Sequence, residues 1–450
     1  MIHTFTLHGL NMVLDVESGA LHILDEPSLA AVEMLQRGAD KKSAADLLAQ
    51  KYGACTSSEV LSEIEELKEK SLLFCERRTI SRDEDGAVKA LCLHLAHDCN
   101  LRCRYCFAGS GNYGGERRLM SAETARQAVD FLLSASLGRR HCEIDFFGGE
   151  PLLNFDVLKQ TVAYGQRQAA EHKKIIKFTL TTNAVALTSD RQNYLNSNEI
   201  SVVLSMDGRR EVHDRMRRFP GGGGSFDSVL ANCRSMVRAR NGDNYYLRGT
   251  YTRHNLDFCN DILAMVSFGF KRVSLEPAVL SPDRDDALRQ EDLPRLREEY
   301  ESLAALLWEQ ESSGEEICFF HFELDLNRGP CAKKRTSGCG AGAAYLAVAP
   351  DGSIYPCHQF VGDESFCAGQ VAKGINSAVL APFLAVGMEQ KEACQKCFAR
   401  YFCGGGCHAA AWQMNGDLLQ PYGLGCELHR IRVECGLYLQ AKRMQSAMSR

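Results

Sequence analysis

Between residues 88 and about 312, short apolar runs of strand character alternate with helical segments, and this alternation limits the possible folds more than any other feature. Strands are predicted at 89–95, 142–147, 175–181, 200–205, 245–251 and 271–275. Helices are predicted at 121–137, 154–171, 189–196, 226–239, 257–268 and 292–311. Strands that are each followed by a helix form a parallel sheet. We therefore predict an α/β fold over 88–312, a partial (β/α)6 barrel of TIM type, with its chemistry on the loops after the strands.

Residues 1–80 are predicted to form a separate unit that resembles a winged helix. "HTFTLHG" and "NMVLDVESGALHILD" alternate in strand fashion around a turn at 17–19, which indicates a hairpin. Three segments of helical periodicity follow, and each begins at a serine that could cap it. A winged helix often binds DNA. This unit is rich in Glu and Asp and no helix has a basic stripe, so a module that binds something other than DNA is favoured.

Charge and hydropathy exclude several classes of protein. The 450 residues have a net charge of −5, which gives no reason to expect nucleic acid as a partner. The first residues lack a basic segment followed by an apolar core, so no secretory signal is predicted. There is no apolar run of membrane-spanning length. We expect a cytoplasmic protein without a membrane span.

The 20 cysteines are far more than a protein of a reducing compartment needs for packing, so they indicate metal binding or catalysis. Seven stand singly and are interpreted as small buried hydrophobic residues: Cys55, Cys75, Cys92, Cys142, Cys233, Cys259 and Cys318. The others gather at 99–106 and 331–435. Because residues 315–450 have little apolar periodicity, we expect metal to hold that region together.

The stretch "CNLRCRYCFA" directly follows the first predicted barrel strand and offers three cysteines, Cys99, Cys103 and Cys106. Three thiolates can hold three irons of a [4Fe–4S] cluster and leave the fourth iron open to a small molecule. A structural zinc ion would require a distant fourth ligand. The spacing therefore favours an iron–sulfur cluster with one open position.

This spacing, with Tyr105 as the aromatic residue before the last cysteine, resembles the signature of radical S-adenosylmethionine enzymes. The resemblance implies that S-adenosylmethionine binds the open iron and is cleaved to a 5′-deoxyadenosyl radical. It also implies that Gly148, Gly149 and Glu150 of "FFGGEP" bind the amino group of the methionine moiety, with Glu150 as acceptor. By the same resemblance Ser205 would contact the ribose or carboxylate end. Arg217 or Arg248 would pair with the carboxylate.

Seven later cysteines are similar in order to the SPASM pattern, a C-terminal extension with two auxiliary [4Fe–4S] clusters, which implies three clusters in all. The resemblance assigns Cys339, Cys357 and Cys407 to an inner cluster. It assigns Cys394, Cys397, Cys403 and Cys426 to an outer cluster. A zinc module is the alternative for such a CxxC pattern. Cys331 is a doubtful fourth inner ligand, and without it one inner iron would be free to bind and deprotonate a substrate thiol.

Over essentially the whole chain the sequence resembles thioether maturases of six-cysteine (SCIFF) precursor peptides. The resemblance implies that residues 1–80 bind the leader of a cysteine-rich precursor peptide by strand addition. It implies a barrel at 88–312, a SPASM domain at 315–450 and a reduced electron donor such as flavodoxin or ferredoxin. The product would be a sactionine- or ranthipeptide-type thioether.

Two other functions remain open at this stage. One is an anaerobic sulfatase-maturing enzyme that makes formylglycine; that group carries an Asp as base where this sequence has His358. The other is a zinc-dependent DNA-binding regulator. We identify no catalytic base from the sequence.

Overall fold

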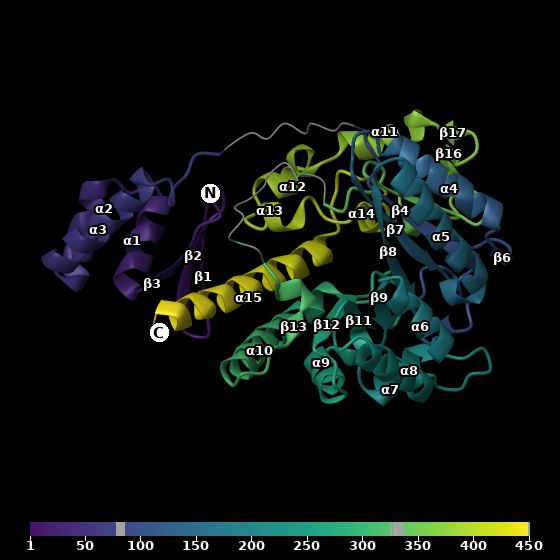
Figure 1. Cartoon of the computed structure of the whole chain (residues 1–450). Coiled ribbons are helices and arrows are strands. Elements are labelled where there is room, and N and C mark those ends of the chain that lie inside the picture. Colours follow the sequence, from purple (N-terminus) through teal and green to yellow (C-terminus); the bar gives the residue numbers. More distant parts are fainter. Residues whose placement is uncertain (78–85, 325, 327–335, 337, 449–450) are drawn as a thin grey trace.

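The computed structural model describes residues 1–77, 86–324, 326, 336 and 338–448. The chain begins with an antiparallel sheet in the order β1-β2-β3 and three helices (Figure 1). Its strands are β1 Ile2–Leu7, β2 Leu10–Asp15 and β3 Leu21–Leu24. Its helices are α1 Glu26–Gln36, α2 Lys41–Tyr52 and α3 Ala54–Glu69. The predicted hairpin is the pair β2–β3, whose turn contains residues 17–19.

The predicted serine caps of these helices are wrong. The side chain of Asp25 caps α1 and accepts a hydrogen bond from the backbone N–H of Ser28. Asp40 caps α2 in the same way through Ser43. An aspartate three residues before each serine makes the stronger acceptor for the free N–H groups of the first turn, so both helices begin earlier than expected. Gly53 precedes α3 without a side-chain hydrogen bond.

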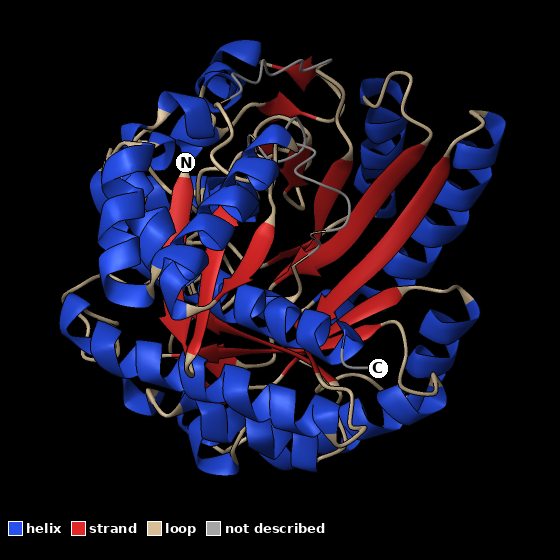
Figure 2. Cartoon of the chain, turned by 90° about the vertical axis from the view of Figure 1, so that its left-hand side faces the viewer, coloured by secondary structure: helices blue, strands red, loops and turns tan. Residues whose placement is uncertain are grey.

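The centre of the molecule is a curved parallel sheet with helices on its outside (Figure 2). Six parallel strands run in the order β12-β11-β9-β8-β7-β4. They are β4 Ala90–His97, β7 His141–Gly148, β8 Ile175–Thr182, β9 Ser201–Ser205, β11 Tyr245–Tyr251 and β12 Arg272–Pro277. The helices between and after them are α4 Ala122–Ala135, α5 Phe155–Glu171, α6 Ser189–Ser197, α7 Arg210–Met216, α8 Phe226–Ala239, α9 Phe258–Ser267 and α10 Leu293–Ser312.

Each predicted strand and helix of this region is present, beginning within one residue and ending within two residues of the prediction. The predicted bounds agree with the structure because the apolar residues that predicted each element are the ones that the fold buries. Strand β7 alternates buried and partly exposed side chains, as a strand packed on one face does. Strand β4 is buried on both faces, and it lies between β7 and β14 Tyr345–Val348 in the sheet. Helix α7 and the short strands β5 Arg102–Cys103, β6 Arg118–Leu119 and β10 Arg217–Arg218 were not predicted.

The region after residue 315 contributes more regular structure than its sequence suggests. Strand β14 pairs in parallel with β4 and so extends the central sheet, and β15 Ile354–Tyr355 pairs with β14. Strand β13 Cys318–Phe319 extends the other end, beside β12. The remaining elements are β16 Gly369–Gln370, β17 Gly374–Ile375, α11 Ser377–Ala385, α12 Glu392–Gln395, α13 Arg400–Cys403, α14 His408–Asn415 and α15 Gly423–Met448.

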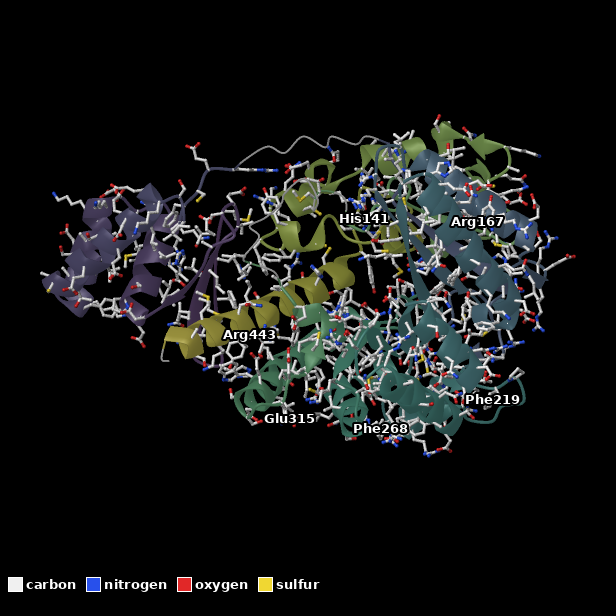
Figure 3. The ribbon with its side chains drawn as sticks, viewed as in Figure 1. His141, Arg167, Phe219, Phe268, Glu315 and Arg443 are labelled. Carbon is white, nitrogen blue, oxygen red and sulfur yellow. The ribbon has the colours of Figure 1, made fainter. Side chains whose placement is uncertain are left out.

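Helix α15 lies between the N-terminal sheet and α10 (Figure 1). It is buried on several sides, with Leu428, Val433 and Leu437 in the core. Arg443 reaches α10, where its Nη2 lies 2.9 Å from Oε2 of Glu311 (Figure 3). No helix in the described part of the chain is long and apolar enough to span a membrane.

The N-terminal unit is docked on the C-terminal region through polar and aromatic contacts. The ring of His3 stacks on Phe398 with centroids 3.5 Å apart, and its Nε2 lies 3.0 Å from Oε1 of Glu434 on α15. Glu17, in the β2–β3 turn, pairs with Arg400 on α13, and both side chains are almost completely buried. The turn of the N-terminal sheet thus contacts the segment between Cys397 and Cys403.

Candidate active site

A cavity of about 270 Å³ opens at the carboxyl ends of the barrel strands, where the fold predicts the chemistry to lie. The loop after β4 lines it with Cys99, Cys103 and Cys106. The ends of β7, β8, β9, β11 and β12 contribute further lining residues, and His358 and Gln359 from the C-terminal region close it. The structure therefore brings the three-cysteine stretch and most of the predicted cofactor contacts to one place.

The three thiols of this loop are free and near one another. Cys103 lies on β5, which pairs with β10 and so ties the loop to Arg217. Burial, with Cys103 and Cys106 nearby, raises the pKa of Cys99 to about 12, and burial, with Cys106 nearby, raises the pKa of Cys103 to about 11. Three cysteines without a disulfide, beside an open cavity, fit a cluster that binds thiolates.

Gly148 and Gly149 are required by the approach of two backbone segments. A Cβ atom on Gly149 would overlap the carbonyl oxygen of Asp98, and one on Gly148 would overlap that of Ala96. The N–H of Gly149 donates to Ala96 at 2.8 Å. The glycines thus allow the end of β7 to pack directly against the cysteine loop, which leaves their own backbone at the cavity wall.

Glu150 lies behind this wall, and it is not among the residues that line the cavity. Its carboxylate is fully buried and accepts three hydrogen bonds from the chain. The donors are the N–H of Leu152 at 3.0 Å, Oγ1 of Thr182 at 2.8 Å and the N–H of Asn183 at 2.8 Å. Burial raises the pKa of Glu150, and these bonds oppose the shift. In this structure the carboxylate orders the loop after β8.

Tyr105 and Arg217 meet beneath the cysteine loop on a buried carboxylate that sequence reasoning missed, Asp207. The Tyr105 hydroxyl donates to Oδ2 of Asp207 at 2.6 Å, and Nε of Arg217 donates to Oδ1 at 3.1 Å. Nη1 of Arg217 lies 3.9 Å from the sulfur of Cys103. Arg217 therefore presents a positive charge at the cluster side of the cavity.

Ser205 and Arg248 lie on neighbouring strands, and β9 and β11 pair them directly in register. Both line the cavity. Arg248 lies on β11, which three strands separate from β4 and its cysteine loop. Its Nη2 lies 3.9 Å from Oε1 of Glu276 at the end of β12. Of the two arginines proposed for the cofactor carboxylate, only Arg217 contacts the cysteine loop in the described residues.

The C-terminal cysteines fall into the two groups suggested by the sequence. Burial raises the pKa of Cys357 to about 12, and Cys407 and Cys339 are close enough to raise it further. The other four cysteines, Cys394, Cys397, Cys403 and Cys426, line a second cavity of about 740 Å³. Each of the two groups is thus gathered in space from distant parts of the chain.

Cys331 lies outside the described residues, so its role stays a prediction. Within the described residues, no three His, Cys, Asp or Glu side chains are gathered as a site for a single metal ion would be. A four-iron cubane holds its thiolates farther apart than one ion does, so this finding does not bear on a cluster.

His358, which the sequence analysis named only as the residue in place of an Asp base, is part of the cavity. It follows Cys357, lines the cavity and contacts the Tyr345 hydroxyl through Nδ1 at 3.2 Å. Burial lowers its pKa to about 4, so the ring is neutral near pH 7. Because His358 directly follows Cys357, its place in the cavity could have been predicted from the sequence.

Comparison with known proteins identifies the central part of the chain. Residues 93–261 match the model of the Radical SAM superfamily. MJ0907 of Methanocaldococcus jannaschii is 28% identical over 45% of this chain and 66% of its own length. The radical SAM cyclopropyl synthase TigE of Paramaledivibacter caminithermalis is 26% identical over 41% of this chain and 40% of its own. A cysteine-type anaerobic sulfatase-maturating enzyme of Clostridium novyi is 22% identical over 69% of this chain and 85% of its own.

Solved structures share the fold. The structure of anSMEcpe with bound AdoMet has a TM-score of 0.64 at 19% identity and covers 79% of this chain and 99% of its own. Streptococcus suis SuiB bound to the precursor peptide SuiA has a TM-score of 0.55 at 14% identity and covers 94% of this chain and 98% of its own. The superfamily implies a [4Fe–4S] cluster and S-adenosylmethionine as cofactors. Residues 93–261, which include the three-cysteine loop, are thus the part of this chain that is similar to the Radical SAM superfamily.

Proposed function

We propose that this chain is a radical SAM peptide maturase that forms an intramolecular Cys thioether in a ribosomally made, cysteine-rich precursor peptide. One observation carries the proposal: a single cavity is lined both by the three-cysteine loop and by His358 and Gln359, which directly follow Cys357 of the inner cysteine group. A peptide in this cavity would lie between a site of radical formation and a site that can hold its thiol. A thioether bond requires a carbon radical and a thiolate on the same substrate.

In this proposal, Cys99, Cys103 and Cys106 hold the cluster that binds S-adenosylmethionine. Cys339, Cys357 and Cys407 hold the inner auxiliary cluster. Cys394, Cys397, Cys403 and Cys426 hold the outer auxiliary cluster. When bound, these groups supply a radical that removes hydrogen from a substrate carbon and an acceptor for the surplus electron.

The chain's own residues position the reactants. Arg217, held by Asp207, offers its guanidinium to the carboxylate of the cofactor. The backbone at Gly148 and Gly149 borders the cofactor's amino group, and Ser205 lies on the wall of the same cavity. An inner cluster with an open iron would fix the substrate sulfur as thiolate, so that no separate base is needed.

The N-terminal unit is proposed to bind the leader of the peptide. Strands β1 and β3 are the edges of its sheet, where an extended peptide can add as a further strand. The match to SuiB with its precursor peptide leaves out only 6% of this chain, fewer residues than the unit contains. The match to anSMEcpe leaves out 21%, enough for the whole unit. The SuiB-like architecture therefore supports a peptide-binding role for residues 1–80.

A sulfatase-maturing enzyme is the second candidate because enzymes of that name match 69% of this chain. The neutral, buried His358 in place of an acidic base speaks against it. A zinc-dependent DNA-binding regulator is disfavoured by the radical SAM domain.

The decisive experiment is the anaerobic reaction of the purified protein with S-adenosylmethionine, a reductant and the cysteine-rich peptide encoded beside its gene. We expect the peptide to lose two hydrogens, and fragmentation to locate a thioether. The Cys99→Ala, Cys103→Ala and Cys106→Ala triple variant should make no 5′-deoxyadenosine and keep its auxiliary iron. Conversion of a sulfatase peptide to formylglycine, with the cysteine-rich peptide unchanged, would favour the second candidate instead.

A further inference from the structure

Glu276 faces the cysteine loop from the opposite side of the cavity. It lies at the end of β12, whereas the loop follows β4, and these two strands stand at opposite ends of the run β12-β11-β9-β8-β7-β4. Its side chain is 28% exposed and lines the cavity. A carboxylate is thus placed in the same cavity as the cysteine loop but on a different strand from Arg217.

The far side of this carboxylate is held by buried partners. Oε2 of Glu276 lies 3.4 Å from Nη1 of Arg432, whose Nε donates to the Tyr300 hydroxyl at 2.9 Å. Oε1 lies 3.3 Å from Nε2 of His321. Burial lowers the pKa of His321 to about 3, so this ring is neutral and donates from one nitrogen only. Burial alone would raise the pKa of Glu276, but His321, Arg432 and Arg248 lower it to about 2. The group is therefore anionic at any working pH and fixed in position.

Arg248 supplies a donor next to this acceptor. Its Nη2 lies 3.9 Å from Oε1 of Glu276, beyond hydrogen-bond distance, and its side chain is 52% exposed. Within the part of the chain that the structure describes, this loose pairing is the only ion pair of the Arg248 guanidinium, which makes no hydrogen bond there. The guanidinium keeps its donors available toward the cavity, and the β11–β12 pairing holds the two residues side by side.

A fixed acceptor beside a free donor matches the backbone of an extended peptide. In an extended chain the N–H and C=O of one residue point to the same side, and antiparallel strands use this to exchange two hydrogen bonds between a pair of residues. We propose that Glu276 and Arg248 clamp one residue of the substrate in this way: Glu276 accepts from its N–H and Arg248 donates to its C=O. Both are positioning residues for the peptide, and this proposal rests on the proposed function in requiring a peptide substrate.

The clamp gives the two arginines of the cavity different partners. Arg217 lies at the cluster side and is committed to Asp207 and the cofactor. Arg248 lies at the Glu276 side and serves the peptide. Holding the N–H and C=O of one residue at this wall turns its Cα–H away from the wall, so the clamp selects which Cα–H is presented to the rest of the cavity.

The test measures peptide and cofactor binding separately for Glu276→Gln and Arg248→Met in the fully cluster-loaded protein. A hydrogen bond to a charged group contributes about 1.5–3 kcal/mol, so each variant should raise KM for the cysteine-rich peptide by roughly 10- to 150-fold. The dissociation constant for S-adenosylmethionine and the rate of 5′-deoxyadenosine formation without peptide should change less than about threefold.

Two controls keep the result interpretable. Arg248 is half exposed, so Arg248→Met tests the clamp without disturbing the core, and iron content reports on folding of Glu276→Gln. Arg253→Met, at an arginine paired with Asp292 outside the cavity lining, should leave both constants unchanged.

The outcomes separate the clamp from the proposed function. Weaker S-adenosylmethionine binding by Arg248→Met, with an unchanged peptide KM, would assign Arg248 to the cofactor and overturn the clamp. Wild-type values for Glu276→Gln would also overturn it. If the wild-type protein itself leaves the peptide uncrosslinked, the proposed function fails; the clamp then stands or falls on the dissociation constant of the unreacted peptide, which both variants should raise.

Discussion

The buried ion pair between Glu17 and Arg400 should control whether the N-terminal unit stays docked. The two side chains are 2% and 1% exposed, and the Glu17 carboxylate also accepts a hydrogen bond from the Tyr401 hydroxyl at 3.0 Å. Removing one partner of a buried pair leaves the other charge without compensation, at a cost of about 3–5 kcal/mol. Since about 1.4 kcal/mol corresponds to a factor of ten, Glu17→Ala should increase undocking by roughly 100-fold or more.

Hydrogen–deuterium exchange of the anaerobic, cluster-loaded protein measures this effect locally. Amides of β1 to β3 and of residues 395–404 should exchange faster in Glu17→Ala, whereas those of β8 should not. The double variant Glu17→Met, Arg400→Met replaces the pair by apolar side chains and should restore most of the protection. Glu33→Ala breaks an exposed pair with Arg37 and should have almost no effect. Unchanged exchange in Glu17→Ala, or a double variant as exposed as the single one, would refute this account of docking.

Three further predictions concern the barrel and the cysteine groups. Burial, with Glu143 nearby, raises the pKa of Asp145 from 3.8 to about 6. The ionised group therefore costs stability above pH 6, up to about 3 kcal/mol, and Asp145→Asn should raise Tm most at pH 8 and progressively less as pH falls from 6 to 4. Lys391 is buried near cysteines of both auxiliary groups, and its Nζ donates to the Gly405 carbonyl at 2.7 Å. In the proposed function, Lys391→Met should lower the midpoint potentials of the proposed auxiliary clusters in an EPR-monitored titration, because a positive charge no longer favours the reduced state. Gly149→Ala should displace the cysteine loop and remove the iron of one cluster together with 5′-deoxyadenosine formation, while auxiliary iron remains.

Local patterns were sufficient to predict the barrel. Its strands and helices repeat a simple alternation of buried segments, so their bounds could be read within two residues. The cysteine groups were expected from the resemblance of their spacing to a known pattern. The structure gathers the cysteines of each group, and the clusters that they would hold stay a prediction.

The residues and elements that were not predicted from the sequence depend on contacts between distant segments. Glu276 acquires its role from Arg432, which lies 156 residues later. Asp207 is recognisable only once β5 and β10 have brought Tyr105 and Arg217 to it. Helix α15 was not predicted because it is buried on several sides and so has no single apolar stripe. Glu150 was expected to accept from the amino group of the cofactor; its carboxylate accepts three hydrogen bonds from the chain, and its role toward a cofactor stays a prediction.

Helix α15 links three parts of the molecule that no other described element joins in this way. It carries Cys426, which lines the second cavity, Arg432, which holds Glu276, and Glu434, which receives His3 of the first strand. A substitution that breaks this helix would therefore disturb the second cavity, the carboxylate of the first cavity and the docking of the N-terminal sheet together. Defects that look independent in separate assays would then have one structural cause.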